Sequence, residues 1–516
     1  MPATSLPTAL GTSSSPAASP AASRAASRSG RRWQPATYRQ GAPVLTGRDR
    51  LIASRFSYGL TPELARQVRR AGGGRAWFRD QLRPGRIADP AVARMAGWWP
   101  SLSLDPVTMT RRSNDGTEHT GVVMNHYQRE LLCRRIVTRR QVLEVLTEFW
   151  ESHFHVPVTG DGVFGFRRDY GETIRAHALG RFADLLHATT THPAMGMFLD
   201  NAESTRVAPN ENLGRELLEI HTVGRGAYDE DDVKDSARIL TGWRVVSWTT
   251  WATDYRPADH WTGPVSVMGF HDANADPDGR ALTRRYTDHL ASHPATVERI
   301  CRKLATKFVA DSPPTSLVRS MVRAWHRTDG SIAQVLTTMV DSREFTRASR
   351  PKVRTPGEDV VATYRALGAV PRRPTRESDA AQEVVWQCYH LGDGPHSWPR
   401  PDGPPVTNDA WSTPNRVLAS FHVHYRMAGG WWPATGTGLR PPRAWLPAKR
   451  LTMAELVDHL CRTMLGRPSS RRLLETACRA VDVAPGARIT RRHRVVRTHM
   501  PVLLTALLDT PDHLTR

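Results

Sequence analysis

The residues best suited to chemistry gather between positions 191 and 243, where acidic, amide and histidine side chains lie close together in the sequence. Glu216 and Glu219 belong to the central run PNENLGRELLEIHTVG (209–224). Two carboxylates could hold a hard cation or move protons, and His153, in an earlier stretch, could supply an imidazole. We therefore take Glu216, Glu219 and His153 as the candidate catalytic residues.

Amide and charged side chains beside this run predict an oxygen-rich pocket. If the fold brings the turn at Asp200 and Asn201 beside Glu216, carboxylate and amide oxygens converge as divalent cations require. Asp200, Glu216 and Glu219 are therefore the candidate ligands of a divalent metal cofactor. The candidate binding residues are Asp200, Asn201, Asn210, Glu211, Asn212 and Arg215.

A structural interpretation competes with this chemical one. On a helix, Arg215 and Glu219 stand four residues apart and would form an ion pair worth roughly a few tenths of a kcal/mol. His221, on the apolar side, would then be a hydrogen-bonded core histidine. Because structural ion pairs also cluster acids, spacing alone favours this interpretation.

Capped helices must position these groups. Asn210 is typical of a helix start, and Thr61–Pro62 predicts another, since a hydroxyl or amide side chain caps an unpaired backbone amide. The apolar side chains of residues 213–220 fall on one helical face, with the polar ones opposite. Gly224 predicts the end of that helix. Asp229, with an acid three residues later, predicts a capping box on the next helix.

His153 ends a long amphipathic stretch that runs from about Val122 to Phe154. In the last turn of a helix, a charged imidazole would cap the C-terminus and contribute up to ~1 kcal/mol through the helix dipole. His155 follows two residues later. A helix would set the two rings roughly 200° apart, which disfavours a chelating pair.

Further distinctive runs are DLLHATTTHPAMGMFLDNAEST (184–205), YDEDDVKDSARILTGW (228–243), FWESHFHV (149–156), HPATVERICRKLATKFV (293–309), LTTMVDSREF (336–345) and WPRPDGPPVTNDAWSTPNRVLA (398–419). With the central run, they resemble the bacterial domain-of-unknown-function 1800 family over about Leu51 to Pro433. His153 matches the histidine of the family's FWxxHF pattern. The resemblance implies an all-α fold and frequent export of relatives, and the family offers no established activity to carry over.

By composition, the 516-residue chain divides into a tail and two helical parts. Residues 1–45 are rich in Ala, Ser, Pro and Arg and lack aliphatic periodicity, which predicts disorder. Residues 46–350 form the main helical domain, and residues 351–516 a C-terminal helical part whose Pro/Trp-rich segment 395–415 lies extended. The predicted fold class is all-α, an irregular multi-helix bundle with long ordered loops and one short hairpin around 244–285.

The formal net charge of +21 raises the question of a nucleic-acid partner. Nearly all of the positive charge is arginine, scattered along polar helix faces. No zinc finger, RNA-binding sequence or phosphate-binding glycine loop accompanies it. These features disfavour nucleic-acid binding. The only lysines are Lys234, Lys303, Lys307, Lys352 and Lys449.

The five cysteines lie far apart and form no CxxC pair, which disfavours a zinc site and a disulfide framework. No run approaches the ~18 apolar residues of a membrane span, and no apolar segment typical of a signal peptide is found. We therefore expect a soluble, cytoplasmic protein. The cysteines are Cys133, Cys301, Cys388, Cys461 and Cys478.

Three functional hypotheses follow. The first is a binding or assembly scaffold with a carboxylate- and amide-lined pocket, in which most acids pair with arginines and the partner is another protein. The second is a metal-dependent, hydrolase-like enzyme that uses the central Glu, Asp and His residues. The third is nucleic-acid binding through arginine, which requires one continuous basic face.

Overall fold

The computed structural model describes residues 42–348 and 351–516. Helix accounts for 58% and strand for 5%, so the all-α prediction is confirmed. The predicted disordered tail, residues 1–45, falls almost entirely outside the described residues. Helices of the first third of the chain are α1 (Gly47–Arg55), α2 (Pro62–Arg70), α3 (Gly74–Gln81), α4 (Pro90–Ala93), α5 (Pro106–Asn114), α6 (Thr120–Val137), α7 (Gln141–His153) and α8 (Arg167–His177).

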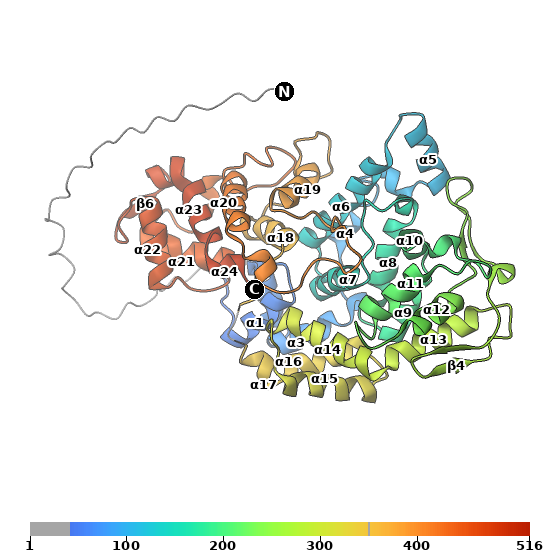
Figure 1. Cartoon of the computed structure of the whole chain (residues 1–516). Helices are drawn as coiled ribbons and strands as arrows, with labels where there is room; N and C mark the ends of the chain where they lie inside the picture. The colour runs from blue at the N-terminus through green and yellow to red at the C-terminus, as the bar shows by residue number, and fades with distance from the viewer. Residues whose placement is uncertain (1–41, 349–350) are drawn as a thin grey trace, which may run out of the picture. The chain divides into compact units, whose positions relative to one another are not determined.

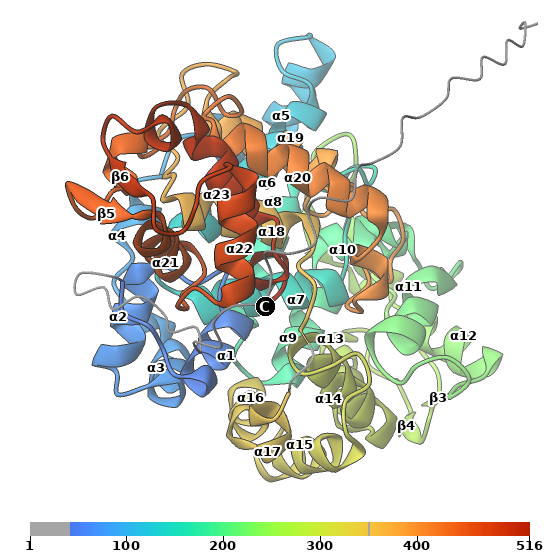
Figure 2. The ribbon, with the colours of Figure 1, turned by 90° about the vertical axis from the view of Figure 1, so that its left-hand side faces the viewer.

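The middle of the chain carries the signature runs and a group of helices that lie side by side in Figures 1 and 2. In this group α14, α15 and α16 pack in succession, and α13 packs on α9. The helices are α9 (Phe182–Thr190), α10 (Pro193–Phe198), α11 (Glu211–Glu216), α12 (Glu230–Ile239), α13 (Arg280–Ser292), α14 (Pro294–Phe308), α15 (Thr315–Arg327), α16 (Ile332–Asp341) and α17 (Arg343–Thr346).

The C-terminal helices pack around α23, which contacts α20, α21 and α22. These helices, orange to red in Figure 1, also carry three of the five cysteines, and every cysteine of the chain is buried in a different helix. The helices are α18 (Pro356–Leu367), α19 (Ala380–His390), α20 (Pro414–Ala428), α21 (Met453–Met464), α22 (Arg471–Ala480), α23 (Met500–Leu508) and α24 (Pro511–Leu514).

The helix starts follow the sequence signals. The side chain of Thr61 accepts a hydrogen bond from the backbone N–H of Leu64, with Pro62 in the first turn of α2. Asn210 caps α11 through the backbone N–H of Asn212. Asp229 forms the predicted capping box with Asp232 at the start of α12. All three predicted starts are confirmed.

Small hairpins differ in number from the prediction. One hairpin was expected around residues 244–285, and the structure has two there, the first of which begins at Trp243. A third hairpin lies in the C-terminal part. Met268 and Gly269 join one pair as a two-residue turn with positive φ at both positions, which methionine does not signal. The antiparallel pairs are β1 (Trp243–Val245) with β2 (Thr253–Tyr255), β3 (Val265–Val267) with β4 (Phe270–Asp272), and β5 (Arg450–Thr452) with β6 (Arg488–Thr490).

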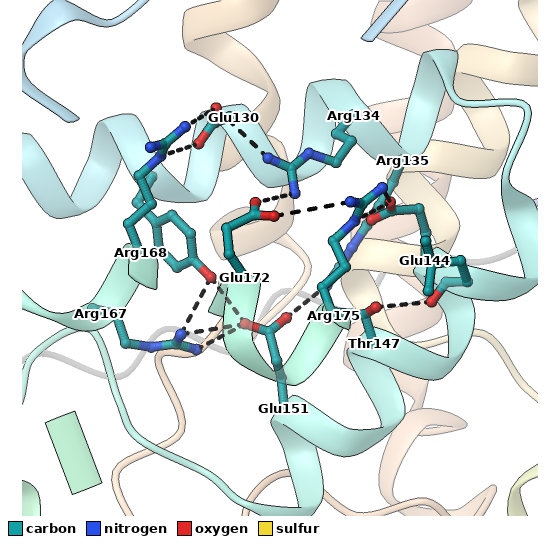
Figure 3. Close-up of polar contacts among 12 residues, drawn as sticks. Glu130, Arg134, Arg135, Glu144, Thr147, Glu151, Arg167, Arg168, Glu172 and Arg175 are labelled. Atoms are coloured by element: carbon teal, nitrogen blue, oxygen red, sulfur yellow. Dashed lines mark hydrogen bonds and ion pairs between the residues drawn. The ribbon is translucent and has the colours of Figure 1, made fainter. Parts of the chain in front are cut away.

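The amphipathic stretch 122–154 forms two helices, α6 and α7, which are interrupted at residues 138–140. Their facing surfaces and α8 hold a largely buried network of glutamates and arginines (Figure 3). Glu151 and Arg167 are 0% exposed and lie 3.2 Å apart, and Arg135 pairs with Glu148 at the same distance. These ion pairs hold α6, α7 and α8 together at an interface that is partly charged. The charges can be buried because each one has an opposite charge beside it.

The Pro/Trp-rich segment 395–415 lies over the end of α7 and forms no helix before Asp409. Its last residues, predicted to be extended, form a 3-10 turn at Asp409–Trp411 and the start of α20. The backbone N–H of Val158 donates to His396 O at 2.9 Å, and Nε2 of His155 donates to Trp398 O at 2.8 Å. Gly403, with φ +67°, lies against the carbonyl oxygen of Ser152. Within residues 42–348 and 351–516, no helix combines the length and apolar character needed to cross a bilayer.

Candidate functional site

The central signature run forms α11 and then a π-helix, η5 (Leu217–His221), where the sequence predicted one continuous α-helix. The apolar side chains of Leu213, Leu217 and Leu218 are fully buried, as expected. Gly214 allows α12 to come close, since a Cβ at this position would lie 2.9 Å from the backbone nitrogen of Ala237. A π-turn adds a residue to the helical turn and so rotates the side chains that follow it.

Most acids of this run pair with neighbouring side chains. Arg215 lies 2.8 Å from Glu230 and 3.2 Å from Glu211. Glu219 pairs with Arg225 and accepts a hydrogen bond from the hydroxyl of Tyr228 at 2.8 Å. The predicted Arg215–Glu219 ion pair is therefore wrong, because the π-turn removes Glu219 from the face on which an α-helix would have placed it.

Glu216 differs from its neighbours. It is half-buried, and no hydrogen bond or ion pair of its carboxylate is found among the described residues. Burial, and then the nearby charge of Glu219, raises its pKa above the ordinary value. A carboxyl group in this state can hold a proton closer to neutral pH than an ordinary glutamate, as a general acid must.

The turn at Asp200 reaches α11 through an amide. Asp200 adopts the left-handed conformation, is exposed, and accepts a hydrogen bond from Nδ2 of Asn212 at 3.0 Å. This contact brings the turn next to the start of α11, one helical turn before Glu216. Among the residues that the structure describes, however, Asp200, Glu216 and Glu219 do not bring their oxygens into one potential metal-binding group.

Asn201 belongs instead to a pocket of about 290 Å³ between α10 and the β1–β2 hairpin. Its Nδ2 donates to Leu240 O at 3.1 Å, whereas its buried Oδ1 has no partner. The buried hydroxyl of Thr190, on the same pocket, also has none. The run 184–205 and the end of the run 228–243 therefore meet at this pocket. Its lining is Thr190, Thr191, His192, Pro193, Gly196, Asn201, Trp243, Arg244, Val245, Thr253, Asp254, Tyr255 and Arg280.

Aromatic rings and balanced charges complete the pocket. The rings of Trp243 and Tyr255 meet edge to face, with centroids 5.1 Å apart. Arg244 lies 3.3 Å from Asp259, and Arg280 lies 2.6 Å from Asp278. Each guanidinium is thus neutralised by a carboxylate of this chain, and the pocket carries little net charge.

His153 lies at the end of α7, as predicted, but it does not act as a charged cap. Its Nε2 donates to the backbone carbonyl oxygen of His221 at 3.1 Å, and its Nδ1 lies 3.0 Å from Nζ of Lys303. Burial, and then Lys303 and Arg299, lower its pKa well below the ordinary value. The ring is therefore neutral, and the dipole-capping interpretation is wrong. His221 is buried too, but its Nε2 lacks the predicted hydrogen bond.

Lys303 is the functional candidate that the sequence interpretation missed. It lies on α14, in the run HPATVERICRKLATKFV, and is half-buried. Burial, and then the charge of Arg299, lower its pKa to about 7. One signal was present in the sequence. In a chain whose positive charge is nearly all arginine, a lysine stands out, because its amine can lose a proton far more readily than a guanidinium can.

A second cluster of potential metal ligands lies in the C-terminal part, at Asp359, His424 and His513. Both ring nitrogens of His424 face carboxylates, with Nε2 3.2 Å from Asp359 and Nδ1 2.8 Å from Asp509. Asp359 raises the pKa of His424 to about 9. Arg416 also lies 3.0 Å from Asp359. Two N–H groups on this imidazole leave it no lone pair for a metal, so the cluster is an ion-pair centre.

Comparison with known proteins places the chain in a family. A family model described as "Protein of unknown function (DUF1800)" matches residues 51–515. No curated protein and no solved structure matches the chain. The match includes the signature run, the end of α7, the Lys303 helix and the C-terminal helices, and so extends beyond the resemblance seen at first. The chain belongs to the DUF1800 family, whose function is unknown.

Proposed function

We propose that this protein is a binding protein for a small, uncharged, polyhydroxylated molecule of the size of a monosaccharide, which it holds between α10 and the β1–β2 hairpin. The observation that carries the proposal is the pair of buried polar atoms without partners, Asn201 Oδ1 and Thr190 Oγ1. A buried polar atom without a hydrogen bond costs about 1–3 kcal/mol, and a ligand hydroxyl would remove that cost.

The size and lining of the pocket support this ligand class. A volume near 290 Å³ equals that of about ten water molecules at ~30 Å³ each, enough for one sugar ring. Trp243 and Tyr255 offer apolar surface to the C–H face of such a ring. Hydroxyl groups can both donate to Asn201 Oδ1 and exchange hydrogen bonds with Thr190.

The charges around the pocket favour a neutral ligand over an ionic one. Arg244 and Arg280 are already paired with Asp259 and Asp278, so an anion would have to compete with carboxylates in place. Asp254, the acid in the lining, is paired with Arg256 at 3.2 Å. A cation would meet the same competition from arginine.

The test compares two threonines on the same helix. In Thr190→Val, the unpartnered hydroxyl is lost, so the stability of the ligand-free protein is expected to stay the same or rise, while ligand affinity falls about tenfold, or ~1.4 kcal/mol. The control is Thr189→Val. Its hydroxyl donates to Leu185 O at 2.9 Å and lies outside the pocket lining, so its loss should lower stability and leave affinity unchanged.

The measurement is calorimetric titration of the whole protein with a panel of monosaccharides, disaccharides and cyclitols, after a screen by thermal shift. Binding that weakens only in Thr190→Val supports the proposal. Absence of binding to the whole panel, or equal affinity for the two variants, contradicts it.

The other two hypotheses have weaker support. A hydrolase-like enzyme is favoured by the raised pKa of Glu216, but the acids chosen as metal ligands lie in separate contacts. Metal analysis of the purified protein, beside a Glu216→Gln variant, tests that alternative. Nucleic-acid binding is favoured only by the net charge, and many of the arginines named above are held by acids of the same chain.

A further inference from the structure

We propose that Lys303 is a nucleophilic amine that captures an aldehyde or ketone as a Schiff base. The residue lies on α14 and is not part of the pocket described above, so the proposal is independent of polyol binding. It rests on the position of the amine, its hydrogen-bond partner and the charges around it.

The amine is held in place by a neutral acceptor. A carbonyl oxygen can only accept, so Nε2 of His153 carries the hydrogen that it donates to His221 O. In a neutral ring, Nδ1 then has a lone pair, and it accepts from Nζ of Lys303 at 3.0 Å. This bond fixes the lysine side chain without adding the negative charge that would keep it protonated.

Lys303 differs from other lysines of the chain in lacking an acidic partner. Lys307 lies 2.9 Å from Glu358, Lys234 lies 2.9 Å from Asp231, and Lys352 pairs with Asp311. No carboxylate lies within ion-pair distance of Lys303 among the described residues. A positive group lies one turn away instead, since Arg299 binds the carbonyl oxygens of Ile220 and Thr222 at the end of the π-helix.

These surroundings favour the uncharged amine. Burial and Arg299 lower the pKa of Lys303 to about 7, against the opposing charge of Asp402. At neutral pH about half of the molecules then carry a free amine at Lys303, compared with roughly one in 2,500 for a lysine of ordinary pKa, about 10.4. The residue as a whole is only partly buried.

One acidic group, Asp402, acts on Lys303 through its charge. The charge of Asp402, in the segment that covers the end of α7, acts on both Lys303 and Glu216 and favours the protonated form of each. Glu216 itself has a raised pKa and no partner.

The proposed step balances without a further reactant. The lone pair of Nζ attacks the carbonyl carbon, and the C–O π electrons move to oxygen to give a carbinolamine. The oxygen then leaves as water with the two hydrogens of the amine, and a C=N bond joins Nζ to the substrate carbon. Hydrolysis reverses the step.

The five lysines make a sharp experiment possible. The whole protein is treated at pH 7 with propionaldehyde and sodium cyanoborohydride, which reduces the Schiff base to a stable amine, and the modified lysines are mapped by peptide mass spectrometry. Lys449 is exposed and serves as the internal control. Lys303 is expected to react at least about tenfold faster than Lys449. A much larger fraction of Lys303 is uncharged at pH 7, and this outweighs two factors that slow its reaction, the lower nucleophilicity of a less basic amine and partial burial.

A variant at the surface tests whether fast labelling of Lys303 is due to its lowered pKa or only to its accessibility. Asp402→Asn, at an exposed position, removes the charge that opposes deprotonation, so labelling of Lys303 at pH 6 should become about two- to fourfold faster. The control is Asp482→Asn, at another exposed position. Labelling of Lys303 no faster than that of Lys449 at pH 7, or a pH profile with a midpoint above 9, would overturn the proposal.

Discussion

A single imidazole sets the charge balance where α20 packs against α18 and α23. His424 is buried, and each of its ring nitrogens faces a carboxylate, Asp359 on one side and Asp509 on the other. Asp359 is held in its charged form as well, since His424 and Arg416 lower its pKa against the effect of burial. The protonated histidine therefore stabilises the fold at neutral pH.

This arrangement gives stability a defined pH dependence. The pKa of His424 is about 9 in the folded protein and about 6.5 in the unfolded chain, so its contribution is complete below pH 6.5 and is lost as pH rises through 9. A difference of about 2.5 pKa units corresponds to about 3 kcal/mol. Removal of this imidazole should therefore cost most below pH 6.5 and little above 9.

The measurement compares the free energy of unfolding of the wild type and His424→Gln in urea between pH 6 and 10. The quantity to follow is the difference between the two proteins, not the stability of the wild type alone. The lowered pKa of Lys303 makes stability rise with pH over the same range, and this contribution cancels in the difference. His422→Gln, at an exposed position on the same helix, is the control. A difference independent of pH would show that His424 is uncharged.

For single residues, the sequence indicated which side chains could be functional but not which other side chains they contact. His153 was found because a recognisable pattern surrounds it, and its position at the end of α7 was correct. Its neutral state could not be predicted, since this depends on burial in the folded core and on Lys303, 150 residues further along the chain. Asn201 was chosen for its oxygens, yet its pocket is built with Trp243 and Tyr255 from the hairpin and not with Glu216.

Among the elements, the segment over α7 depends on one glycine. Gly403 has φ +67°, a conformation that costs a residue with a Cβ roughly 1 kcal/mol, and a Cβ would also overlap the carbonyl oxygen of Ser152. Gly403→Ala should therefore loosen the segment from α7. The backbone N–H of Val158, which donates to His396 O, should exchange its hydrogen faster.

Gly392→Ala provides the matched control, because this glycine also has a positive φ, +104°, but no atom lies within 4 Å of the added Cβ. Both variants include backbone strain, and only Gly403→Ala adds the overlap. Equal acceleration of exchange at Val158 in the two variants would rule out a specific contact between the segment and α7.

Local sequence signals correctly predicted where three helices begin. They did not predict where the α-helix α11 changes into a π-helix. Thr61, Asn210 and Asp229 cap helices because a cap needs only its own neighbours in sequence. The π-helix at 217–221 is different: the carbonyl oxygens at its end bind Arg299 on α14, a contact that no local pattern contains. The same π-turn prevented the predicted pairing of Arg215 with Glu219.

For the molecule as a whole, contacts cross the boundary predicted at residue 350. Helix α6 packs on α18 and α19. Lys307 and Arg516 both pair with the buried carboxylate of Glu358, at 2.9 and 3.0 Å. Arg365 donates to the carbonyl oxygen of Ile136 at 2.9 Å. A core shared in this way couples the unfolding of the two parts.

We therefore expect residues 46–350 and 351–516 to unfold in one transition by calorimetry, with tryptophan fluorescence and circular dichroism changing together. Lys307→Met should lower the temperature of that transition, because loss of one partner of a buried ion pair costs about 3–5 kcal/mol. Lys234→Met, which removes an exposed pair, should change it little. Two separate transitions would instead support two independent domains.

The helical class could be predicted from sequence, because amphipathic periodicity and caps are local properties. The pairing of the helices could not, because many contacts between them are made by charged side chains. Glu151 and Arg167 are 0% exposed, although their types are typical of a surface. For residues such as these, polarity alone does not predict whether a side chain lies inside the molecule or on its surface.

The burial of the cysteines turns them into reporters of motion. Each thiol lies in a different helix, α6, α14, α19, α21 or α22, and burial raises its pKa, to about 12 at Cys301. A thiol reagent therefore reacts with each one only after its helix opens. The labelling rate of each thiol therefore reports how readily its own region opens, and no mutation is needed to place the probe. The five probes are Cys133, Cys301, Cys388, Cys461 and Cys478.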